Sequence, residues 1–320
     1  MSNKNFNTGK NTVTYMSDGL KLTANLFMPS DYQEGQKRPA LVFTRPGSGV
    51  KEQTAGIYAE ELCKHGFVTL AFDARGYGES EGHQGVEDPF NICEDTKNSV
   101  SYMRTLDCVD INNVFSVGVC MGAGYASYAT ALDGRVRGIG MIGPYLNAAQ
   151  QNIDAAGGVG MIRNTLLQMT GNARQQYFEN GEDIIMQPVP KDAKEAEQPG
   201  TLPIQHGMMT YYLPGKPGGT QNCPNWKNGL SLYNFEALIS FSAFNVLHLM
   251  ENIPFFMALG SEAYTVENSK DFYEKVPGPK ELEFIEGAGH FDLYWKPEHV
   301  KPIGEKMSKF FKSHSVEPQA

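Results

Sequence analysis

Residues 118–122, Gly-Val-Cys-Met-Gly, follow the apolar run 114–117 and open onto a stretch of small residues, 123–129, typical of a closely packed helix. A sharp strand-to-helix turn flanked by glycines is a nucleophile elbow, which holds its central residue in a strained backbone conformation. The glycines are needed because strand and helix lie too close for larger side chains. Cys120 is therefore the predicted nucleophile, with sulfur in place of oxygen.

Segments typical of buried strands alternate with helical patterns on both sides of this turn. The strand-like segments are 12–15, 20–27, 40–43, 68–72, 114–119, 136–142, 254–259 and 282–285, and the helical ones are 53–65, 95–106 and 299–312. The turn Ser17-Asp18-Gly19 predicts an antiparallel hairpin at the start. The remaining alternation predicts an α/β fold with a doubly wound, mostly parallel sheet.

The alternation stops between residues 147 and 252, a segment too long for one α/β crossover. We interpret it as a helical cap, with helical pieces at 159–169 and 238–249, inserted into a core made of residues 1–146 and 253–320. Two interpretations of its methionines and aromatic residues stay open, because they would line an apolar acyl pocket or form the cap's own core. These residues are Met161, Met169, Tyr177, Met208, Met209, Tyr211, Tyr212 and Trp226.

Composition excludes several classes of function. The net charge of -9 argues against nucleic acid or an anionic membrane surface as partner, since both require basic patches. Residues 1–7 contain no apolar leader and no long uncharged stretch follows, so we expect a cytoplasmic protein. The 5 cysteines are scattered and predict neither a disulfide framework nor a zinc site. No nucleotide or metal motif is present, so no cofactor is predicted.

His290 is the predicted base, because it lies in Gly-Ala-Gly-His-Phe, residues 287–291, directly after the last strand-like segment. The third member of a triad is normally an acid after the preceding strand, where Glu262 is the best-placed carboxylate. Glu267 and Asp271 are assigned to the next helix, and Asp292 follows the histidine too closely to orient it. A thiolate beside an imidazolium and a helix N-terminus is activated at neutral pH even where the acid is weak.

An oxyanion hole requires two backbone N–H groups aimed at one point. Met121, which follows the nucleophile, is expected to supply one of them. The loop Arg-Pro-Gly-Ser-Gly, residues 45–49, is expected to supply the other, from Gly47 or Ser48. Arg75 and Tyr77 in the next glycine-rich turn are expected to be structural or to face the rim of the pocket.

Together, residues 45–56, 72–80, the cysteine elbow and residues 287–294 resemble the dienelactone-hydrolase-like branch of the α/β-hydrolase superfamily. Within it, the chain looks most similar to the fungal polyketide transferases and their bacterial relatives, over nearly its whole length. A cysteine in the elbow is usual there. The chain departs from the family pattern at two positions: relatives often have His where Arg45 stands, and many have Asp where Tyr264 stands. If this carboxylate is absent, a Cys120–His290 dyad remains.

The resemblance implies acyl transfer through a covalent acyl-cysteine on a polyketide-type thioester or ester, with a small-molecule acyl substrate that a carrier protein or coenzyme A would present. Transfer, cyclisation to a lactone and hydrolytic release stay open as outcomes. One alternative is a dienelactone-hydrolase-like hydrolase of small lactones or esters, which predicts a small, polar pocket. Another is a catalytically silent binding protein. The sequence leaves open whether the chain forms a homodimer.

Overall fold

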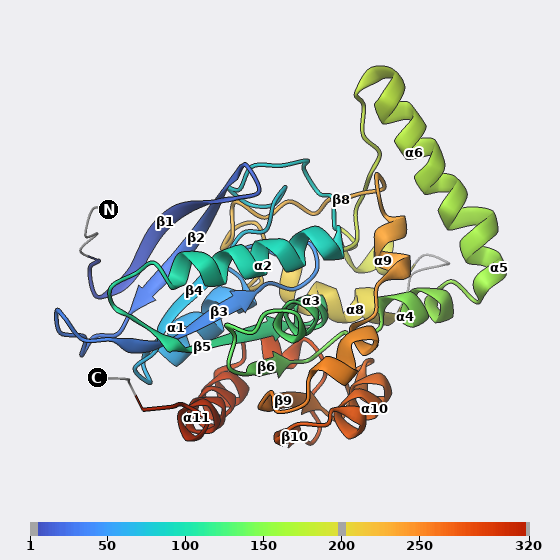
Figure 1. Cartoon of the computed structure of the whole chain (residues 1–320). Helices are drawn as coiled ribbons and strands as arrows, with labels where there is room; N and C mark the ends of the chain where they lie inside the picture. The colour runs from blue at the N-terminus through green and yellow to red at the C-terminus, as the bar shows by residue number, and fades with distance from the viewer. Residues whose placement is uncertain (1–5, 198–202, 318–320) are drawn as a thin grey trace.

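A sheet of eight strands forms the centre of the molecule (Figure 1). The computed structural model describes residues 6–197 and 203–317. In sheet order the strands are β1 (Gly9–Ser17), β2 (Leu20–Met28), β4 (Val68–Phe72), β3 (Arg38–Thr44), β5 (Val109–Val119), β6 (Ile139–Ile142), β9 (Phe255–Gly260) and β10 (Lys280–Ile285). The pairs β1–β2 and β2–β4 are antiparallel, and all other neighbours are parallel. The predicted hairpin and the mostly parallel sheet are confirmed.

Helices cover both faces of the sheet (Figure 1). Helices α1 (Thr54–Cys63) and α11 (Pro297–Ser313) pack on one face, and α2 (Pro89–Met103), α3 (Met121–Ala131) and α10 (Val266–Lys275) pack on the other. Side chains alternate between the layers along each strand. In β3, Leu41 and Phe43 belong to the α1–α11 layer, whereas Ala40 and Val42 belong to the layer under α2.

Helix α2 begins earlier than the sequence pattern predicts, at Pro89 instead of residue 95. The Asp88 carboxylate caps it, accepting hydrogen bonds from the backbone N–H groups of Phe90 (2.9 Å) and Asn91 (3.2 Å). A proline at the first helical position costs nothing there because that N–H has no intrahelical partner. The cap therefore sets the start of the helix where the apolar pattern alone does not.

The segment between β6 and β9 forms a separate group of short elements. They are α4 (Ala148–Ala155), α5 (Val159–Met161), the π-helix η1 (Ile162–Leu166), α6 (Leu167–Asn180), the paired strands β7 (Ile185–Met186) and β8 (Leu230–Ser231), α7 (Ala193–Ala196), α8 (Pro203–Tyr212), α9 (Glu236–Ser240) and the 3-10 helix η2 (Ala243–Leu249). Figure 1 shows α6 standing out from the rest of the molecule. The expected helix at 238–249 is interrupted at Phe241, whose backbone is extended, and Ser242 caps the 3-10 helix that follows.

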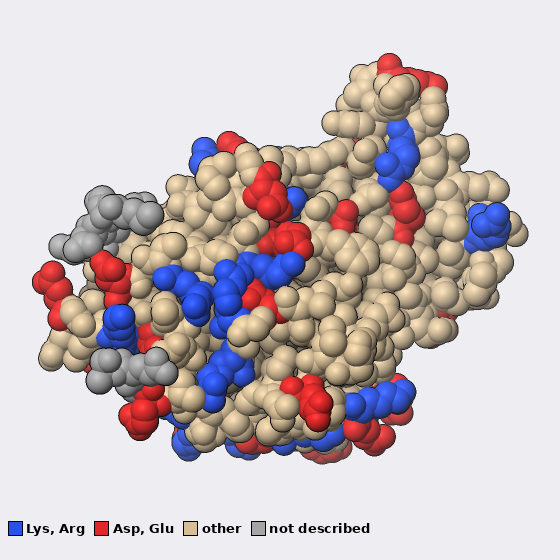
Figure 2. All heavy atoms as spheres, in the orientation of Figure 1, with Lys and Arg blue, Asp and Glu red and all other residues tan. Residues whose placement is uncertain are grey.

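Charged side chains on the face shown in Figure 2 are mixed, with Asp and Glu among the Lys and Arg over the sheet half of the molecule. Arg75 pairs with Asp95 and with Asp18, and Arg135 pairs with Asp133. The segment that contains α5 and α6 is mostly uncharged on this face. Within residues 6–197 and 203–317, no helix has the length and apolarity that crossing a bilayer requires.

The carboxyl ends of β3, β5, β6, β9 and β10 lie along one edge of the sheet, because these strands are parallel. The loops that leave them therefore gather at this edge, which is where open α/β sheets place their ligands. They carry Gly47, Cys120, Tyr264 and His290.

Candidate active site

The elbow holds Cys120 in the strained conformation that its sequence predicts. Its φ is 53° and its ψ is -122°, between the end of β5 and the start of α3. A Cβ atom on Gly118 would lie 2.3 Å from the Gly122 carbonyl oxygen, and one on Gly122 would lie 2.2 Å from that of Arg45. No other residue type fits at these two positions without moving the backbone. Both flanking glycines are therefore required by the close approach of strand, helix and loop.

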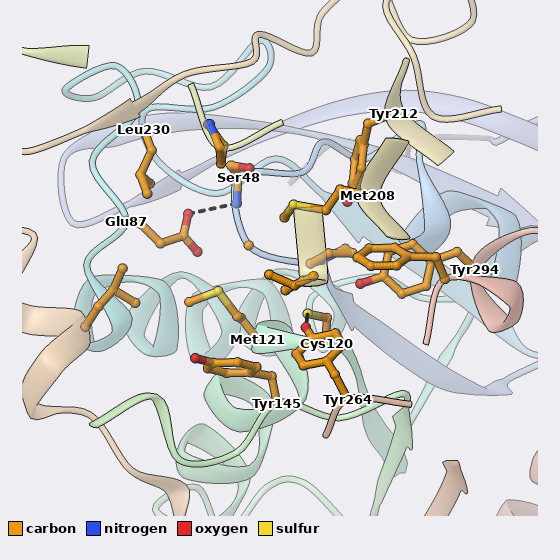
Figure 3. Close-up of a pocket in the computed structure, with 16 residues that line it drawn as sticks. Ser48, Glu87, Cys120, Met121, Tyr145, Met208, Tyr212, Leu230, Tyr264 and Tyr294 are labelled. Carbon is orange, nitrogen blue, oxygen red and sulfur yellow. Dashed lines mark hydrogen bonds between the residues drawn. The ribbon is translucent and has the colours of Figure 1, made fainter. Parts of the chain in front are cut away.

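Two tyrosine hydroxyls connect Cys120 to His290. The Tyr264 hydroxyl lies 3.9 Å from Cys120 Sγ and 3.5 Å from His290 Nε2, and the Tyr294 hydroxyl lies 3.2 Å from the same nitrogen. Interaction with the Tyr294 hydroxyl also lowers the pKa of the Cys120 thiol. Among the described residues, no hydrogen bond joins Sγ to the imidazole directly. Figure 3 shows Cys120 with Tyr264 and Tyr294 beside it.

Burial keeps both partners neutral in the resting site. Desolvation raises the pKa of the Cys120 thiol above its usual value, although hydrogen bonds from Tyr294 and Tyr264 oppose this shift. Desolvation also lowers the pKa of His290 to about 3. Each effect disfavours the charged form of a buried group. The site therefore holds a thiol and a neutral imidazole at neutral pH, and not the thiolate and imidazolium that we expect from the sequence.

Interactions with the backbone N–H groups of Met121 and Gly47 lower the pKa of the Cys120 thiol. The Ser48 N–H is not directed at the sulfur, because it donates a hydrogen bond to Glu87 Oε2 at 3.1 Å. Of the two loop residues named from the sequence, Gly47 is the one whose amide faces the nucleophile. A pair of amides aimed at one point is the arrangement that stabilises an oxyanion.

The structure does not join Glu262 to the base. Its side chain is exposed, and His290 Nδ1 is buried without a hydrogen-bond partner. Asp292, which lies too close to the histidine in sequence to orient it, accepts a hydrogen bond from the Gly289 N–H and pairs with Lys296. The role of Glu262 as triad acid stays a prediction, and within residues 6–197 and 203–317 no carboxylate hydrogen-bonds to the imidazole.

A buried ion pair stands behind the loop that carries Gly47. Arg45 Nη1 donates to Glu87 Oε1 at 2.8 Å, and its guanidinium lies 4.0 Å from the centre of the Tyr77 ring. Tyr125 donates to the same carboxylate oxygen at 3.1 Å. Glu87 thereby fixes the loop through Arg45 and the Ser48 N–H at once. Tyr77 is buried in this cluster, so it does not face the rim of the pocket.

An apolar cavity of about 130 Å³ opens onto the nucleophile. Its walls are Pro46, Gly47, Ser48, Glu87, Cys120, Met121, Tyr145, Pro188, Ile204, Met208, Tyr212, Leu230, Leu238, Tyr264, Phe291 and Tyr294. Figure 3 shows Glu87 and Cys120 on opposite sides, with Met121 between them. Six of these residues belong to segment 147–252, so that segment closes the cavity over the sheet edge.

The residues proposed from the sequence as acyl-pocket lining divide into three groups. Met208 and Tyr212 line the cavity. Tyr211 and Trp226 are buried beside it, where Tyr211 bonds to Thr54 and the Trp226 indole donates to the Ser48 carbonyl. Met161, Met169 and Tyr177 are exposed on the projecting helices, and Met209 lies outside the cavity wall. The interpretation as pocket lining therefore holds for Met208 and Tyr212, and the interpretation as buried packing holds for Tyr211 and Trp226. Neither holds for the exposed residues on α5 and α6.

Sequence reasoning missed Glu87, Tyr145 and Tyr294 as site residues. Tyr294 follows His290 by one helical turn within the quoted motif, which is a usable signal because the short helix η3 (Asp292–Tyr294) turns it back toward the imidazole. Tyr264 had only one signal, which is that the resemblance described above leads one to expect Asp at that position. Glu87 has none, because its loop carries no motif.

Comparison with known proteins identifies the family. Residues 36–210, more than half of the chain, match the Hydrolase_4 family, described as serine aminopeptidase, S33. The uncharacterized protein YcjY of Escherichia coli strain K12 is 29% identical over 97% of this chain and 98% of its own length. The match is to the family and does not test the dienelactone-hydrolase-like branch.

Two fungal relatives carry names that state an activity. The polyketide transferase claH of Penicillium crustosum is 24% identical, covering 86% of this chain and 88% of its own. The thiohydrolase aneE of Aspergillus aculeatus is 25% identical, covering 86% of this chain and 84% of its own.

Solved structures show the same fold. The hypothetical protein PA2218 of Pseudomonas aeruginosa has a TM-score of 0.85 and 26% identity, covering 95% of this chain and 93% of that one. The α/β-hydrolase GrgF of a Penicillium species has a TM-score of 0.79 and 22% identity, covering 96% and 99% of the two chains. The predicted α/β-hydrolase fold is thereby confirmed.

Proposed function

The chain belongs to the Hydrolase_4 family of α/β-hydrolases, and from this premise we propose that it is an acyltransferase or thioester hydrolase that uses Cys120 as its nucleophile. The substrate would be a small acyl thioester or ester of the polyketide type. The names of the relatives claH and aneE support transfer and hydrolysis respectively as outcomes. Fold alone would not support an activity, so the proposal depends on the site.

One observation carries the proposal. The Cys120 sulfur lies at a strained elbow, its pKa is lowered by the Met121 and Gly47 amides, and it faces an apolar cavity. An acyl carbonyl bound in this cavity would place its carbon against the sulfur and its oxygen near the two amides. Charge that develops on this oxygen would then be stabilised in a water-poor site, where such hydrogen bonds are strongest.

Acylation would begin from the neutral pair. As Sγ attacks the carbonyl carbon, its proton passes to the Tyr264 or Tyr294 hydroxyl, which in turn gives its own proton to His290 Nε2. The tetrahedral oxygen is held by Met121 and Gly47. When the intermediate collapses, the imidazolium returns its proton to the departing thiol, and an acyl-cysteine remains. Water or an alcohol then releases the acyl group by the reverse sequence of proton transfers.

The size of the cavity favours a second candidate within the same chemistry. A volume of about 130 Å³ is smaller than the ~300–1,000 Å³ of ordinary ligand sites. A short acyl chain or a small lactone fits such a space more readily than a long polyketide. Hydrolysis of small esters or lactones is therefore the second candidate, although the apolar walls favour an acyl chain over a polar substrate.

Intact-mass spectrometry after exposure to acyl-N-acetylcysteamine thioesters of graded chain length tests the proposal. We expect an acyl adduct that disappears in Cys120→Ala and persists in Cys223→Ala, the matched control at a buried cysteine outside the cavity. The chain length that reacts fastest would separate the two candidates. Absence of any adduct, with thioesters and with small lactones, would support a catalytically silent binding protein instead.

A further inference from the structure

Two cavities meet at a wall formed by Tyr264 and Phe291. The first is the apolar cavity described above, which Cys120 lines and His290 does not. The second has a volume of about 320 Å³, and His290 lines it whereas Cys120 does not. Ile204 belongs to both, together with the two aromatic residues of the wall. The nucleophile and the base therefore open onto different spaces.

Polar and charged side chains also line the second cavity. Thr210, Glu262 and Asp292 line it. Asp292 is neutralised by Lys296 at 2.6 Å, whereas the Glu262 carboxylate has no ion-pair or hydrogen-bond partner among the described residues. One uncompensated negative charge repels anions and leaves an acceptor for hydroxyl groups. His290 is 3% exposed and its Nδ1 has no hydrogen-bond partner among the residues described, so the imidazole keeps an unused hydrogen-bonding group.

The Tyr264 side chain lies in the wall between the two cavities, where its movement would open one cavity to the other. Its hydroxyl lies between Cys120 Sγ and His290 Nε2, while 39% of its surface is exposed. Its ring lies 4.5 Å from the imidazole, centre to centre. Rotation of this one side chain would let a molecule in the second cavity reach both the imidazole and the sulfur.

We propose, on the basis of the function proposed above, that the second cavity is the acceptor site for acyl transfer, that it admits uncharged alcohols, and that Tyr264 is its gate. The acyl chain occupies the first cavity as a thioester of Cys120. With the gate open, the acceptor hydroxyl oxygen bonds to the acyl carbon and its proton moves to His290 Nε2. The carbon–sulfur bond breaks, an ester leaves, and the sulfur regains the proton from the imidazolium.

The test follows preformed acyl-enzyme by intact mass as it reacts with lactamide or with lactate, which share one hydroxyl and differ by one negative charge. Transfer to lactamide is expected to be about tenfold faster than to lactate, with a smaller ratio in Glu262→Gln. Thr210→Phe places an aromatic ring in the wall of the second cavity, which narrows it, and gives up only a local hydrogen bond to the Gly207 carbonyl. It should slow transfer to lactamide at least about tenfold while acylation changes no more than about twofold.

Thr220→Phe is the matched control, an exposed threonine of segment 147–252 outside both cavities, and it should alter neither step. A second comparison isolates the gate. Both Tyr264→Phe and Tyr264→Ala lack the hydroxyl, but only the alanine variant removes the wall. Without acceptor, its acyl-enzyme is expected to be hydrolysed at least about tenfold faster than that of the phenylalanine variant.

Equal rates with lactamide and lactate would overturn the inference, as would unchanged transfer in Thr210→Phe or no transfer to either acceptor from an acyl-enzyme that has formed. Equal lifetimes of the two Tyr264 variants would overturn the gate. Failure of the wild-type protein to form any acyl-enzyme is a different result. It would overturn the proposed function, and this inference with it.

Discussion

Removal of the two tyrosine hydroxyls should reveal how the proton travels from Cys120 to His290. Tyr264→Phe and Tyr294→Phe each delete one oxygen and keep the ring, so the packing of the site is preserved. The Tyr294 oxygen is 3.2 Å from Nε2, and that of Tyr264 is 3.5 Å away. Because either hydroxyl can pass the proton, each single variant keeps one path.

Positioned proton transfer contributes about 10²- to 10⁴-fold to a reaction rate. We therefore expect losses of about threefold to tenfold in each single variant and of about 10²- to 10³-fold in the double variant. The factor by which the rate loss of the double variant exceeds the product of the two single losses measures how far each hydroxyl can replace the other. If both singles lose tenfold and the double loses 10³-fold, the coupling is about 1.4 kcal/mol.

The assay is single-turnover acylation by an N-acetylcysteamine thioester, with Tyr128→Phe on α3, outside the cavity, as the matched control. The melting temperature of each variant checks that the fold is intact. A double variant that acylates within about threefold of the wild-type rate would refute the relay. Faster acylation in Tyr264→Phe would do the same, because it would mean that the hydroxyl keeps sulfur and imidazole apart.

Other predictions follow from burial and charge. Since burial raises the pKa of Cys120, its alkylation by iodoacetamide should accelerate from pH 6 to 9; a plateau below pH 7 would indicate a preformed thiolate. Burial lowers the pKa of His290 to about 3, so below pH 6.5 the imidazole is protonated in the unfolded chain but not in the folded one. The folded state therefore loses stability as the pH falls below 6.5. The loss is about 1.4 kcal/mol per pH unit, or roughly 2–3 kcal/mol by pH 4.5, and urea unfolding of His290→Gln should lack this slope. Glu87→Gln breaks the buried pair with Arg45 and should cost about 3–5 kcal/mol by urea unfolding, part of which Arg45→Met should restore in the double variant; no loss in the single variant would contradict the role of the pair. Glu262→Gln should leave the acylation rate within about twofold, and a larger fall would show that its carboxylate reaches the imidazole.

Local signals explain why the fold could be predicted from the sequence. The elbow requires glycine two residues before and two residues after the nucleophile, because a Cβ atom at Gly118 or Gly122 would collide with nearby backbone. The two glycines therefore mark its position in the sequence. Buried parallel strands read as short apolar runs and the opening hairpin as an alternating pattern around a turn. The apolar pattern does not set the helix boundaries, because the start of α2 depends on one capping carboxylate at Asp88.

The site was only partly predictable, because its chemistry comes from contacts between distant loops. Cys120 and His290 stand in glycine-rich contexts that can be recognised locally. Glu87 reaches the Ser48 amide across 39 residues of sequence, and Tyr264 meets Cys120 across 144. Nothing in the local sequence of either residue signals these contacts. The two departures from the resembled family pattern, at Arg45 and Tyr264, were the clues to where the arrangement differs, since Arg45 pairs with Glu87 and Tyr264 contacts Cys120.

The missing carboxylate and the neutral pair have a common physical origin. A carboxylate at Nδ1 would stabilise the imidazolium and raise the pKa of His290, which would favour proton transfer from the thiol before any substrate binds. Nδ1 is instead buried, with no hydrogen-bond partner in the part of the chain that the structure describes, and Tyr264 presents a neutral hydroxyl to both reacting atoms. Charge separation in this site therefore needs the acyl carbonyl, whose developing oxyanion is taken up by the Met121 and Gly47 amides. We infer that nucleophile formation is coupled to substrate binding, so that the sulfur is protected from adventitious electrophiles in a way that a standing thiolate is not.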